Sequence, residues 1–267
     1  MKPIQTMQLN SPHNSLLNYQ LHGNGAPLVI LHGLFGTLEN WGSQIKALSE
    51  HFQVIAVDLR NHGRSPHTDD MNYALMVDDI INLLDDLGLD KVNLMGHSMG
   101  GKVAMQLALT HPERLNKLIV VDISPVAYEH HHKDVLKGLF SIDLAHIKSR
   151  TDADKQLGAY IPEPGIRAFL LKNLYRDENK QFQWRMNLPV LDKHYDDISA
   201  APTGHPFNGK TLFIKGEESH YIQTDHRDGI LALFPKATYK IIQGAGHWPH
   251  AEKPAIFTKI LINFLQA

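Results

Sequence analysis

The sequence predicts an α/β fold in which a mostly parallel sheet is flanked by helices. Short apolar runs, each long enough for one buried strand, alternate along the chain with segments whose apolar residues recur at helical spacing. Such alternation is typical of strand–helix–strand units, whose strands pair in parallel. Several runs end in a polar or charged residue, and in parallel sheets the chemistry collects at the carboxyl ends of the strands. The predicted strands lie at 28–31, 54–58, 92–95, 118–121, 211–214 and 239–242.

Length and composition narrow the class of protein. With 267 residues the chain can bury one large core, and its 43% hydrophobic and 20% charged residues are ordinary for a soluble globular protein. The net charge of −2 provides no bulk attraction to nucleic acid or to an anionic membrane. The chain has no cysteine, which excludes disulfides, thiolate metal sites and a cysteine nucleophile. Residues 1–14 lack the apolar stretch of a signal peptide, and no run of about 18 apolar residues occurs, so we expect a cytoplasmic protein without membrane insertion.

The first half of the chain follows the alternating pattern closely. An early strand is expected at 15–21, and a helix at 40–50 separates the first two buried strands. The clearest helix pattern covers 73–87, where apolar residues recur at steps of three and four. Asn72 is its expected N-cap and Gly88 its expected stop.

The stretch 124–206 departs from this alternation. Its apolar residues fall at helical spacing, and its 11 Lys and Arg residues match its 11 Asp and Glu residues, so it has no net charge to attract a polyanion. We predict a helical cap, inserted between two strands, whose apolar faces cover a cavity. The chain then consists of a core, 1–123 and 207–267, and a cap, 124–206. Within the second part of the core, helices are expected at 224–234 and 253–265.

One short motif indicates the chemistry. Gly96-His97-Ser98-Met99-Gly100 fits G-x-S-x-G and lies between the predicted strand at 92–95 and a helical run. Small residues two before and two after Ser98 permit a sharp turn in which strand and helix approach closely. The turn would expose the Ser98 hydroxyl as a nucleophile. It would also place the N–H of Met99 at a helix N-terminus, where that group can stabilise an oxyanion.

Two glycine-rich loops follow other predicted strands. The first, His32-Gly33-Leu34-Phe35-Gly36, can turn tightly and direct backbone N–H groups at a ligand. The second, Gly244-Ala245-Gly246-His247-Trp248-Pro249-His250, can bring a histidine over the sheet edge toward the serine. Asp58 and Arg60, which follow the strand at 54–58, are charged residues beside the core. We expect structural partners for both rather than a catalytic role.

The histidine content is high, with 18 residues, and three of them are consecutive at 130–132. Adjacent residues on a helix or strand point in different directions, so these three cannot all ligate one metal ion without an unusual backbone. We interpret them as a solvated polar patch. Neither a metal nor an organic cofactor is expected.

In their order along the chain, these motifs resemble the α/β-hydrolase superfamily. The runs Asp58-Leu59-Arg60-Asn61-His62-Gly63-Arg64-Ser65-Pro66 and Val121-Asp122-Ile123-Ser124-Pro125 resemble more specifically the small bacterial esterases that hydrolyse fatty-acyl esters and acyl-CoA thioesters. The resemblance implies an α/β-hydrolase fold with a helical cap between strands six and seven. It also implies Ser98 as nucleophile and His247 as general base, with the N–H groups of Leu34 and Met99 as the oxyanion hole.

The residues expected to line the substrate site are His32, Phe35, His97 and Trp248. The fallback for the base is His250, on the same loop as His247.

The acid of the catalytic triad is where this chain departs from most of the superfamily. Most members carry an aspartate after strand seven in a pattern like G-x-x-D, and here that position is Ser219. The resembled subfamily instead places its acid after strand six, which corresponds to Asp122. We therefore expect Asp122 to orient the histidine. Glu217, Glu218 and Asp225 are the alternatives.

These expectations describe hydrolysis of a small-molecule acyl ester or thioester through an acyl-enzyme, without a cofactor. The alternative enzyme is a hydrolase or lyase that cleaves a C–C bond with the same triad. Its anionic substrates would need arginines at the cavity, and the candidates are Arg60, Arg64, Arg167 and Arg176. A coenzyme A thioester would need cations at the cavity mouth, for which the candidates are Lys172, Arg176 and Lys180. A non-catalytic binding protein on this fold is the alternative of a different class.

Overall fold

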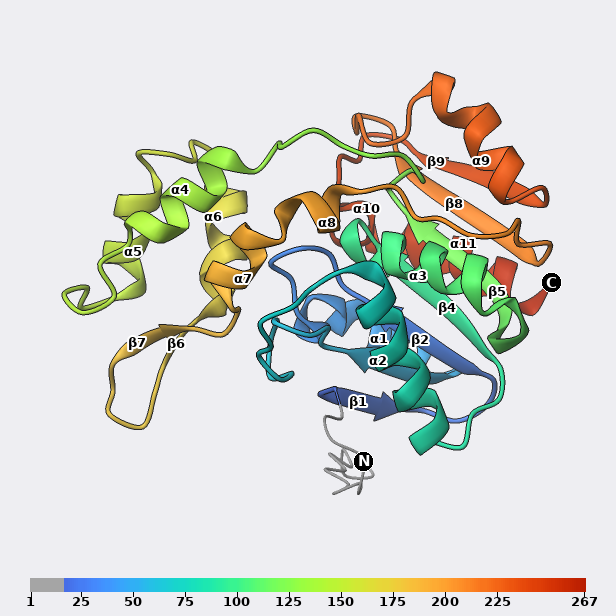
Figure 1. Ribbon diagram of the computed structural model, residues 1–267, viewed down its shortest axis with the longest axis horizontal. Helices are drawn as coiled ribbons and strands as arrows, with labels where there is room; N and C mark the ends of the chain where they lie inside the picture. The colour runs from blue at the N-terminus through green and yellow to red at the C-terminus, as the bar shows by residue number, and fades with distance from the viewer. Residues whose placement is uncertain (1–16) are drawn as a thin grey trace.

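A seven-stranded sheet forms the centre of the computed structural model, which describes residues 17–267 (Figure 1). Its strands are β1 (Tyr19–His22), β2 (Pro27–Leu31), β3 (Gln53–Val57), β4 (Val92–His97), β5 (Leu115–Val121), β8 (Lys210–Gly216) and β9 (Ala237–Ile242). They lie in the order β1-β3-β2-β4-β5-β8-β9, with β1 antiparallel to β3 and every other pair parallel. The predicted parallel sheet is confirmed. The first two residues of the early strand expected at 15–21 lie outside the described residues.

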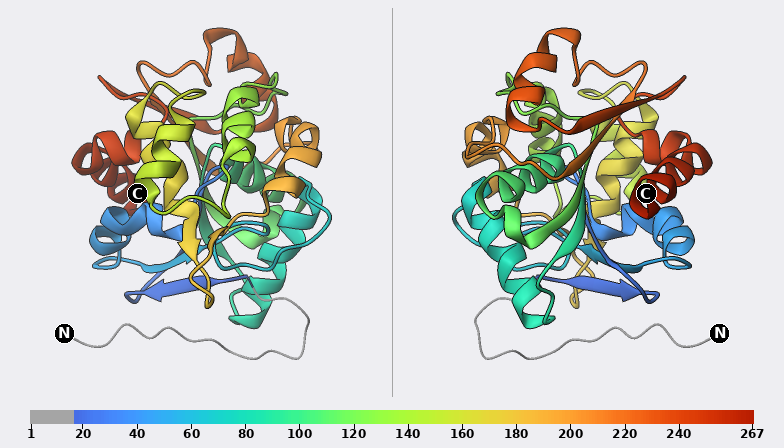
Figure 2. Two further views of the ribbon diagram at one scale, coloured as in Figure 1. Left: turned by 90° about the vertical axis from the view of Figure 1, so that its left-hand side faces the viewer. Right: turned by 90° about the vertical axis from the view of Figure 1, so that its right-hand side faces the viewer.

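Helices cover both faces of the sheet (Figure 2). One face carries α1 (Gly42–Leu48) and α11 (Pro254–Gln266), and the other carries α2 (Tyr73–Asp86) and α3 (Met99–Thr110). Because successive residues of a strand point to opposite faces, alternate residues of β2 join the two different core clusters. Shorter elements complete the core: η1 (Leu38–Trp41), η2 (Pro112–Arg114), η4 (Thr224–His226), α9 (Arg227–Leu233) and α10 (Pro249–Glu252).

Helix α2 forms where the periodicity predicts it. The Asn72 side chain accepts a hydrogen bond from the N–H of Leu75 at 2.9 Å and thereby caps the helix. The helix gives way to Gly88, whose φ of 65° is favourable for glycine and strained for other residues. In the described residues, no helix is both long and apolar enough to cross a lipid bilayer.

The insertion between β5 and β8 lies to one side of the sheet (Figure 1). In chain order these are the fifth and sixth strands of the sheet in the described part of the chain. The insertion contains α4 (Lys133–Ser141), α5 (Arg150–Leu157), α6 (Pro164–Leu170), η3 (Leu171–Asn173), α7 (Leu188–Lys193) and α8 (Tyr195–Ser199). The division into core and cap at residues 124 and 206 remains our proposal.

The insertion also holds a small hairpin that an all-helical cap does not include. Strands β6 (Leu174–Arg176) and β7 (Phe182–Trp184) pair in antiparallel fashion. Strand β7 alternates apolar and polar side chains, the period of a half-exposed strand, whereas β6 grows steadily more exposed from Leu174 to Arg176. Lys180 in the turn has φ of 61°. The expectation of helices alone was therefore wrong for this segment, because strands of three residues are too short to be distinguished by periodicity.

Helix α3 holds both connections of the insertion. Lys102 is buried, and its ammonium donates hydrogen bonds to the carbonyl oxygens of Val126, on the way in, and of Ala200, on the way out. Gln106 exchanges two further hydrogen bonds with the backbone of Thr203, at 2.7 and 2.9 Å. Burial lowers the pKa of Lys102 to about 7. Both connections are thus fixed to the helix that starts directly after Ser98.

Candidate active site

Ser98 stands at the turn between β4 and α3 with φ of 52° and ψ of −119°, a conformation that costs a non-glycine residue free energy. The glycines on either side allow this turn. A Cβ on Gly96 would lie 2.1 Å from the carbonyl oxygen of Gly100, and a Cβ on Gly100 would lie 2.4 Å from that of His32. Only glycine fits at both positions, so the close approach of strand and helix explains the small residues of the motif.

Two backbone N–H groups next to Ser98 are available to a ligand. Met99 is the first residue of α3, so its N–H has no acceptor within the helix. The N–H of Leu34 has no hydrogen-bond partner among residues 17–267. Gly33 brings this loop against the serine, since a Cβ there would lie 3.2 Å from Ser98 Cβ. The arrangement therefore leaves two free backbone donors in the immediate neighbourhood of the Ser98 side chain.

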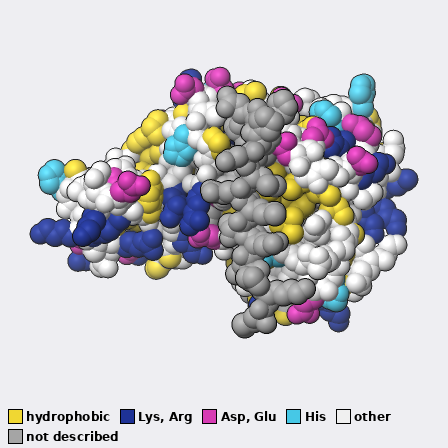
Figure 3. All heavy atoms as spheres, turned by 90° about the horizontal axis from the view of Figure 1, so that it is seen from below, with side chains coloured by type: hydrophobic (Ala, Val, Ile, Leu, Met, Phe, Trp, Pro, Cys, Tyr) yellow, Lys and Arg dark blue, Asp and Glu magenta, His cyan; other side chains and the backbone are white. Residues whose placement is uncertain are grey.

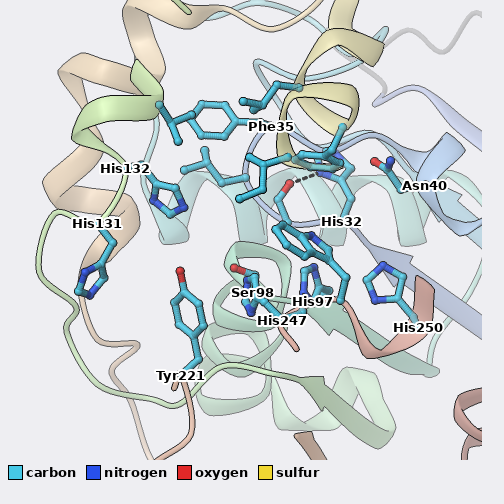
Figure 4. A pocket seen from close by; sticks show the side chains of 18 of the residues that line it. His32, Phe35, Asn40, His97, Ser98, His131, His132, Tyr221, His247 and His250 are labelled. Carbon is cyan, nitrogen blue, oxygen red and sulfur yellow. Dashed lines mark hydrogen bonds between the residues drawn. The ribbon is translucent and has the colours of Figure 1, made fainter. Parts of the chain in front are cut away.

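Two buried histidines hold the Leu34 loop in place. His32 donates from Nδ1 to the carbonyl oxygen of Gly33 at 2.8 Å, the bond drawn in Figure 4, and its Nε2 accepts from the N–H of Leu59 at 3.0 Å. His62 Nε2 accepts from the N–H of Phe35 at 3.2 Å. Burial lowers the pKa of His32 to about 4 and that of His62 to about 3, so both rings are neutral near pH 7. With both ring nitrogens of His32 used by the backbone, that residue can offer a substrate only its ring carbons.

Asp122 follows β5, has φ of 52° and is fully buried. Its Oδ2 accepts from His247 Nδ1 at 2.7 Å and from the Ser219 hydroxyl, and its Oδ1 accepts from the N–H of Gly216 at 3.0 Å. The bond to Asp122 puts the ring proton of neutral His247 on Nδ1 and leaves Nε2 with a free lone pair. Ser219 occupies the position where most of the superfamily has its acid. Its hydroxyl donates a hydrogen bond to Asp122, the carboxylate that follows the preceding strand of the sheet.

The alternative acids point elsewhere. Glu217 accepts from the N–H of Gly244 at 2.9 Å, and Asp225 is exposed beside His226, 3.9 Å from its Nε2. Glu218 is exposed. In the described chain, Asp122 is the carboxylate that contacts His247.

Aromatic rings pack around His247. The ring of Tyr221 stacks on it with the centroids 4.1 Å apart, and Trp248 lies edge-on at 5.4 Å. His97 donates from Nε2 to the carbonyl oxygen of His247 at 2.7 Å, which fixes the backbone of the loop. Burial, together with the neighbouring His247 and His250 rings, lowers the pKa of His97 well below its usual value. The fallback base, His250, is buried and stacks on Trp41 at 4.2 Å.

The comparisons with known proteins agree with this geometry. A family model for the alpha/beta hydrolase fold matches residues 26–144. A putative esterase/lipase from Haemophilus influenzae is 43% identical over 257 residues, which cover 94% of this chain and 88% of the relative. The chain belongs to the α/β-hydrolase family. An sn-1-specific diacylglycerol lipase ABHD11 from Mus musculus is 42% identical, with 93% of this chain and 85% of the relative covered. Among solved structures, a marine microorganism esterase superposes with a TM-score of 0.92 at 40% identity, covering 94% of this chain and all of that one.

In this α/β-hydrolase, Ser98 and His247 lie at the wall of a cavity of about 260 Å³ under the insertion (Figure 4). All of the side chains expected at the substrate site, His32, Phe35, His97 and Trp248, line it. Apolar residues of the insertion close the opposite wall: Val135, Ile166, Phe169 and Leu170. Among residues 17–267, no lysine, arginine, aspartate or glutamate lines the cavity. The cavity is thus a predominantly apolar space with a hydroxyl and an imidazole at one wall.

Sequence reasoning missed several residues of this hydrolase site. His62 lies in the run 58–66, which carries part of the family resemblance but predicts no role for this histidine, and Tyr221 lies in the loop after β8, where the sequence offers only carboxylates as candidates. His132, part of the run at 130–132, is half-buried at the cavity and its Nδ1 lies 2.5 Å from the Tyr195 hydroxyl, while His130 pairs with Asp196. The three histidines therefore do not converge, and the described residues bring together no metal-binding group of three.

Proposed function

We propose that this protein hydrolyses neutral carboxylic esters through an acyl-enzyme on Ser98. The observation that carries the proposal is the 2.7 Å bond between Asp122 and His247 Nδ1, formed beside a serine at a strained strand-to-helix turn. Nucleophile, base and orienting acid of a serine hydrolase are recognised by such mutual geometry. The esterase and lipase names of the similar proteins support the same class of reaction.

In the proposed mechanism, His247 Nε2 accepts the proton of the Ser98 hydroxyl as Oγ attacks the ester carbonyl carbon. Asp122 stabilises the imidazolium that forms. The N–H groups of Leu34 and Met99 bind the oxyanion, and one such donor is worth about 10²–10³ in kcat. His247 then gives the proton to the departing alcohol oxygen. A water molecule attacks the acyl-enzyme by the same steps and restores the serine.

We further propose that the substrate is neutral, because no lysine or arginine of the described chain lines the cavity under the insertion. The nearby ammonium of Lys102 already donates to the carbonyl oxygens of Val126 and Ala200. Three of the four arginines considered for an anionic substrate are already paired with a carboxylate. Arg60 pairs with Asp79 at 2.6 Å and Arg167 with Asp154 at 2.8 Å. Arg64 is exposed and lies 4.0 Å from Glu39. A carboxylate or pyrophosphate group that entered this cavity would lose its hydration without gaining a charged partner. This argues against the C–C bond reaction and against coenzyme A as the leaving group.

The three cations considered for coenzyme A, Lys172, Arg176 and Lys180, are exposed, and none of them lines the cavity at Ser98. Arg176 and Lys180, with Lys148, line a surface hollow of about 440 Å³ at the hairpin, which shares no lining residue with the cavity at Ser98. Figure 3 shows lysine and arginine side chains on this part of the molecule, at the left of the view. The cytoplasmic location expected from the sequence stays a prediction.

One comparison tests this proposal. The same acyl group is offered as an aryl ester and as a coenzyme A thioester, to the wild type and to Ser98→Ala. We expect kcat/KM to favour the aryl ester and to fall at least about 10⁴-fold in the variant. Undiminished hydrolysis by Ser98→Ala would overturn the nucleophile. A preference for the thioester would overturn the neutral substrate, and no turnover of either compound would favour the C–C bond enzyme or the binding protein.

A further inference from the structure

Ser98 lies between two cavities rather than at the wall of one. A second cavity, of about 40 Å³, also has Ser98 in its wall. Figure 4 shows His131, His132 and Tyr221 on one side of Ser98 and His97 and His250 on the other. The first group borders both cavities, whereas His97 and His250 border only the larger one. An ester whose carbonyl carbon lies at Ser98 can therefore extend one substituent into the larger cavity and the other into the smaller one.

The two cavities differ in which part of the machinery they contain. His247 and Trp248 line the larger cavity and are absent from the wall of the smaller one. Met99, which follows the nucleophile, lines the smaller cavity alone. The smaller cavity is lined by side chains from both parts of the protein, among them Ile123 of the core and Ile198 of α8, which are both buried. Lys102 and Glu129 also line it.

The position of the base decides which part of the substrate occupies which cavity. In the proposed mechanism, His247 must reach the departing oxygen to protonate it, so the alcohol extends along the cavity that His247 lines. The acyl substituent is bound to the same carbon and points away from the base. We infer that the smaller cavity is the acyl subsite, and that this hydrolase takes esters of a short acyl group with a large apolar alcohol. This inference rests on the proposed function and adds the identity of the two subsites.

The volumes give the expected lengths. A cavity needs about 10–15 Å³ to accommodate a single water-sized group. The smaller cavity, of about 40 Å³, exceeds this minimum only a few times over, so we expect it to take short acyl groups, from acetyl to butyryl. The larger cavity, of about 260 Å³, has room for a much larger group. The apolar wall formed by the insertion suits an alcohol of that size without a charge.

Two crossed ester series test the assignment. The first keeps 1-naphthol as the alcohol and varies the acyl group from acetyl to decanoyl; the second keeps the acetyl group and varies the alcohol from methanol to octanol. We expect kcat/KM to be highest between acetyl and butyryl and to fall at least tenfold by octanoyl. In the second series we expect a rise of at least tenfold with alcohol length. An increase of kcat/KM with acyl length up to octanoyl would reverse the assignment of the cavities.

A pair of variants makes the test local. Ile198→Ala removes three carbon atoms from the wall of the smaller cavity alone, and should move the best acyl group to about hexanoyl without changing the alcohol series. Ile166→Ala is the matched control, since Ile166 lines the larger cavity alone and should alter only the alcohol series. An unchanged acyl optimum in a folded Ile198→Ala protein would contradict the inference.

The wild-type series decide the question even when that variant does not fold. Ester hydrolysis that depends on Ser98 but favours long acyl groups would refute the subsite assignment and leave the proposed function standing. Failure to hydrolyse every ester in both series would overturn the proposed function, and the subsite assignment with it.

Discussion

Replacing Asp122 by asparagine changes the proton position on His247 while keeping the size of the side chain. The amide oxygen of the variant can still accept from the N–H of Gly216, a bond of 3.0 Å in the wild type. Its NH₂ group then takes the place of Oδ2, where it faces the Ser219 hydroxyl and His247 Nδ1. Two donors cannot share one hydrogen bond, so the imidazole must carry its proton on Nε2. In that tautomer the ring cannot accept the proton of Ser98.

The expected loss follows from this tautomer. The same exchange in a serine protease triad lowers kcat by about 10⁴, equivalent to about 5 kcal/mol of transition-state stabilisation. We expect a similar fall in kcat/KM for Asp122→Asn, measured by release of p-nitrophenol from its acetyl ester at pH 7. KM should change little, because Asp122 is fully buried and does not border the cavity.

Asp58→Asn is the matched control for this change. Asp58 is also a buried aspartate after a strand, and accepts from the N–H of Leu38 at 2.8 Å, the N–H of Arg64 at 2.9 Å and the side chain of Asn18 at 2.7 Å. It has no contact with His247 in the described chain, so this variant should lose stability but retain kcat/KM to within about tenfold. An Asp122→Asn protein that keeps more than about a tenth of the wild-type kcat/KM would refute the orienting role of Asp122.

Three further outcomes follow from the structure. Ser219→Ala removes one hydrogen bond to the buried carboxylate of Asp122, a bond worth about 1.5–3 kcal/mol. We therefore expect kcat/KM in the same assay to fall about 10- to 100-fold. An unchanged kcat/KM would show that Asp122 does not need this donor. Gly100→Ala puts a Cβ 2.4 Å from the carbonyl oxygen of His32, and calorimetry should show Tm lowered by about 5 °C or more; a Tm within 1 °C or so of the wild type would contradict the tight turn. The folded-state pKa values of about 4 for His32 and about 3 for His62 lie below the unfolded value of 6.5. As the pH falls, these two histidines are therefore protonated in the unfolded chain before they are protonated in the folded protein. Each should lower the free energy of unfolding by about 2 kcal/mol between pH 7 and pH 5. A urea midpoint that does not move between these pH values would refute that reading.

The features that the sequence predicts are those with local causes. Gly96 and Gly100 are required by contacts within one turn, so G-x-S-x-G between a strand and a helix is visible without the rest of the fold. Asp122 follows an apolar run directly, His247 lies in the loop after the last strand, and the common direction of parallel strands brings the ends of these strands to one edge. The position of the acid is different, because Asp122 is expected only from the resemblance to the small esterases, and the common sheet edge explains how a carboxylate there can reach the histidine.

The remaining features depend on partners distant in the chain. Ser219 and Asp122 are 97 residues apart, and no pattern around either predicts that one supports the other. His97 reaches the carbonyl of His247 across 150 residues. The burial of Lys102 and the presence of a second cavity likewise arise from how the insertion packs on α3, which helical spacing does not specify. Tertiary packing, rather than local propensity, decides these parts of the site.

The most direct test of the proposed chemistry is covalent capture of the nucleophile. A fluorophosphonate transfers its phosphonyl group to an activated serine with loss of fluoride, and mass spectrometry of the digested protein locates the adduct. We expect one adduct per chain, at Ser98, absent in Ser98→Ala and formed at least about 10³-fold more slowly in His247→Ala because the base is then missing. An adduct at another residue, or labelling of His247→Ala at the wild-type rate, would contradict a serine activated by His247.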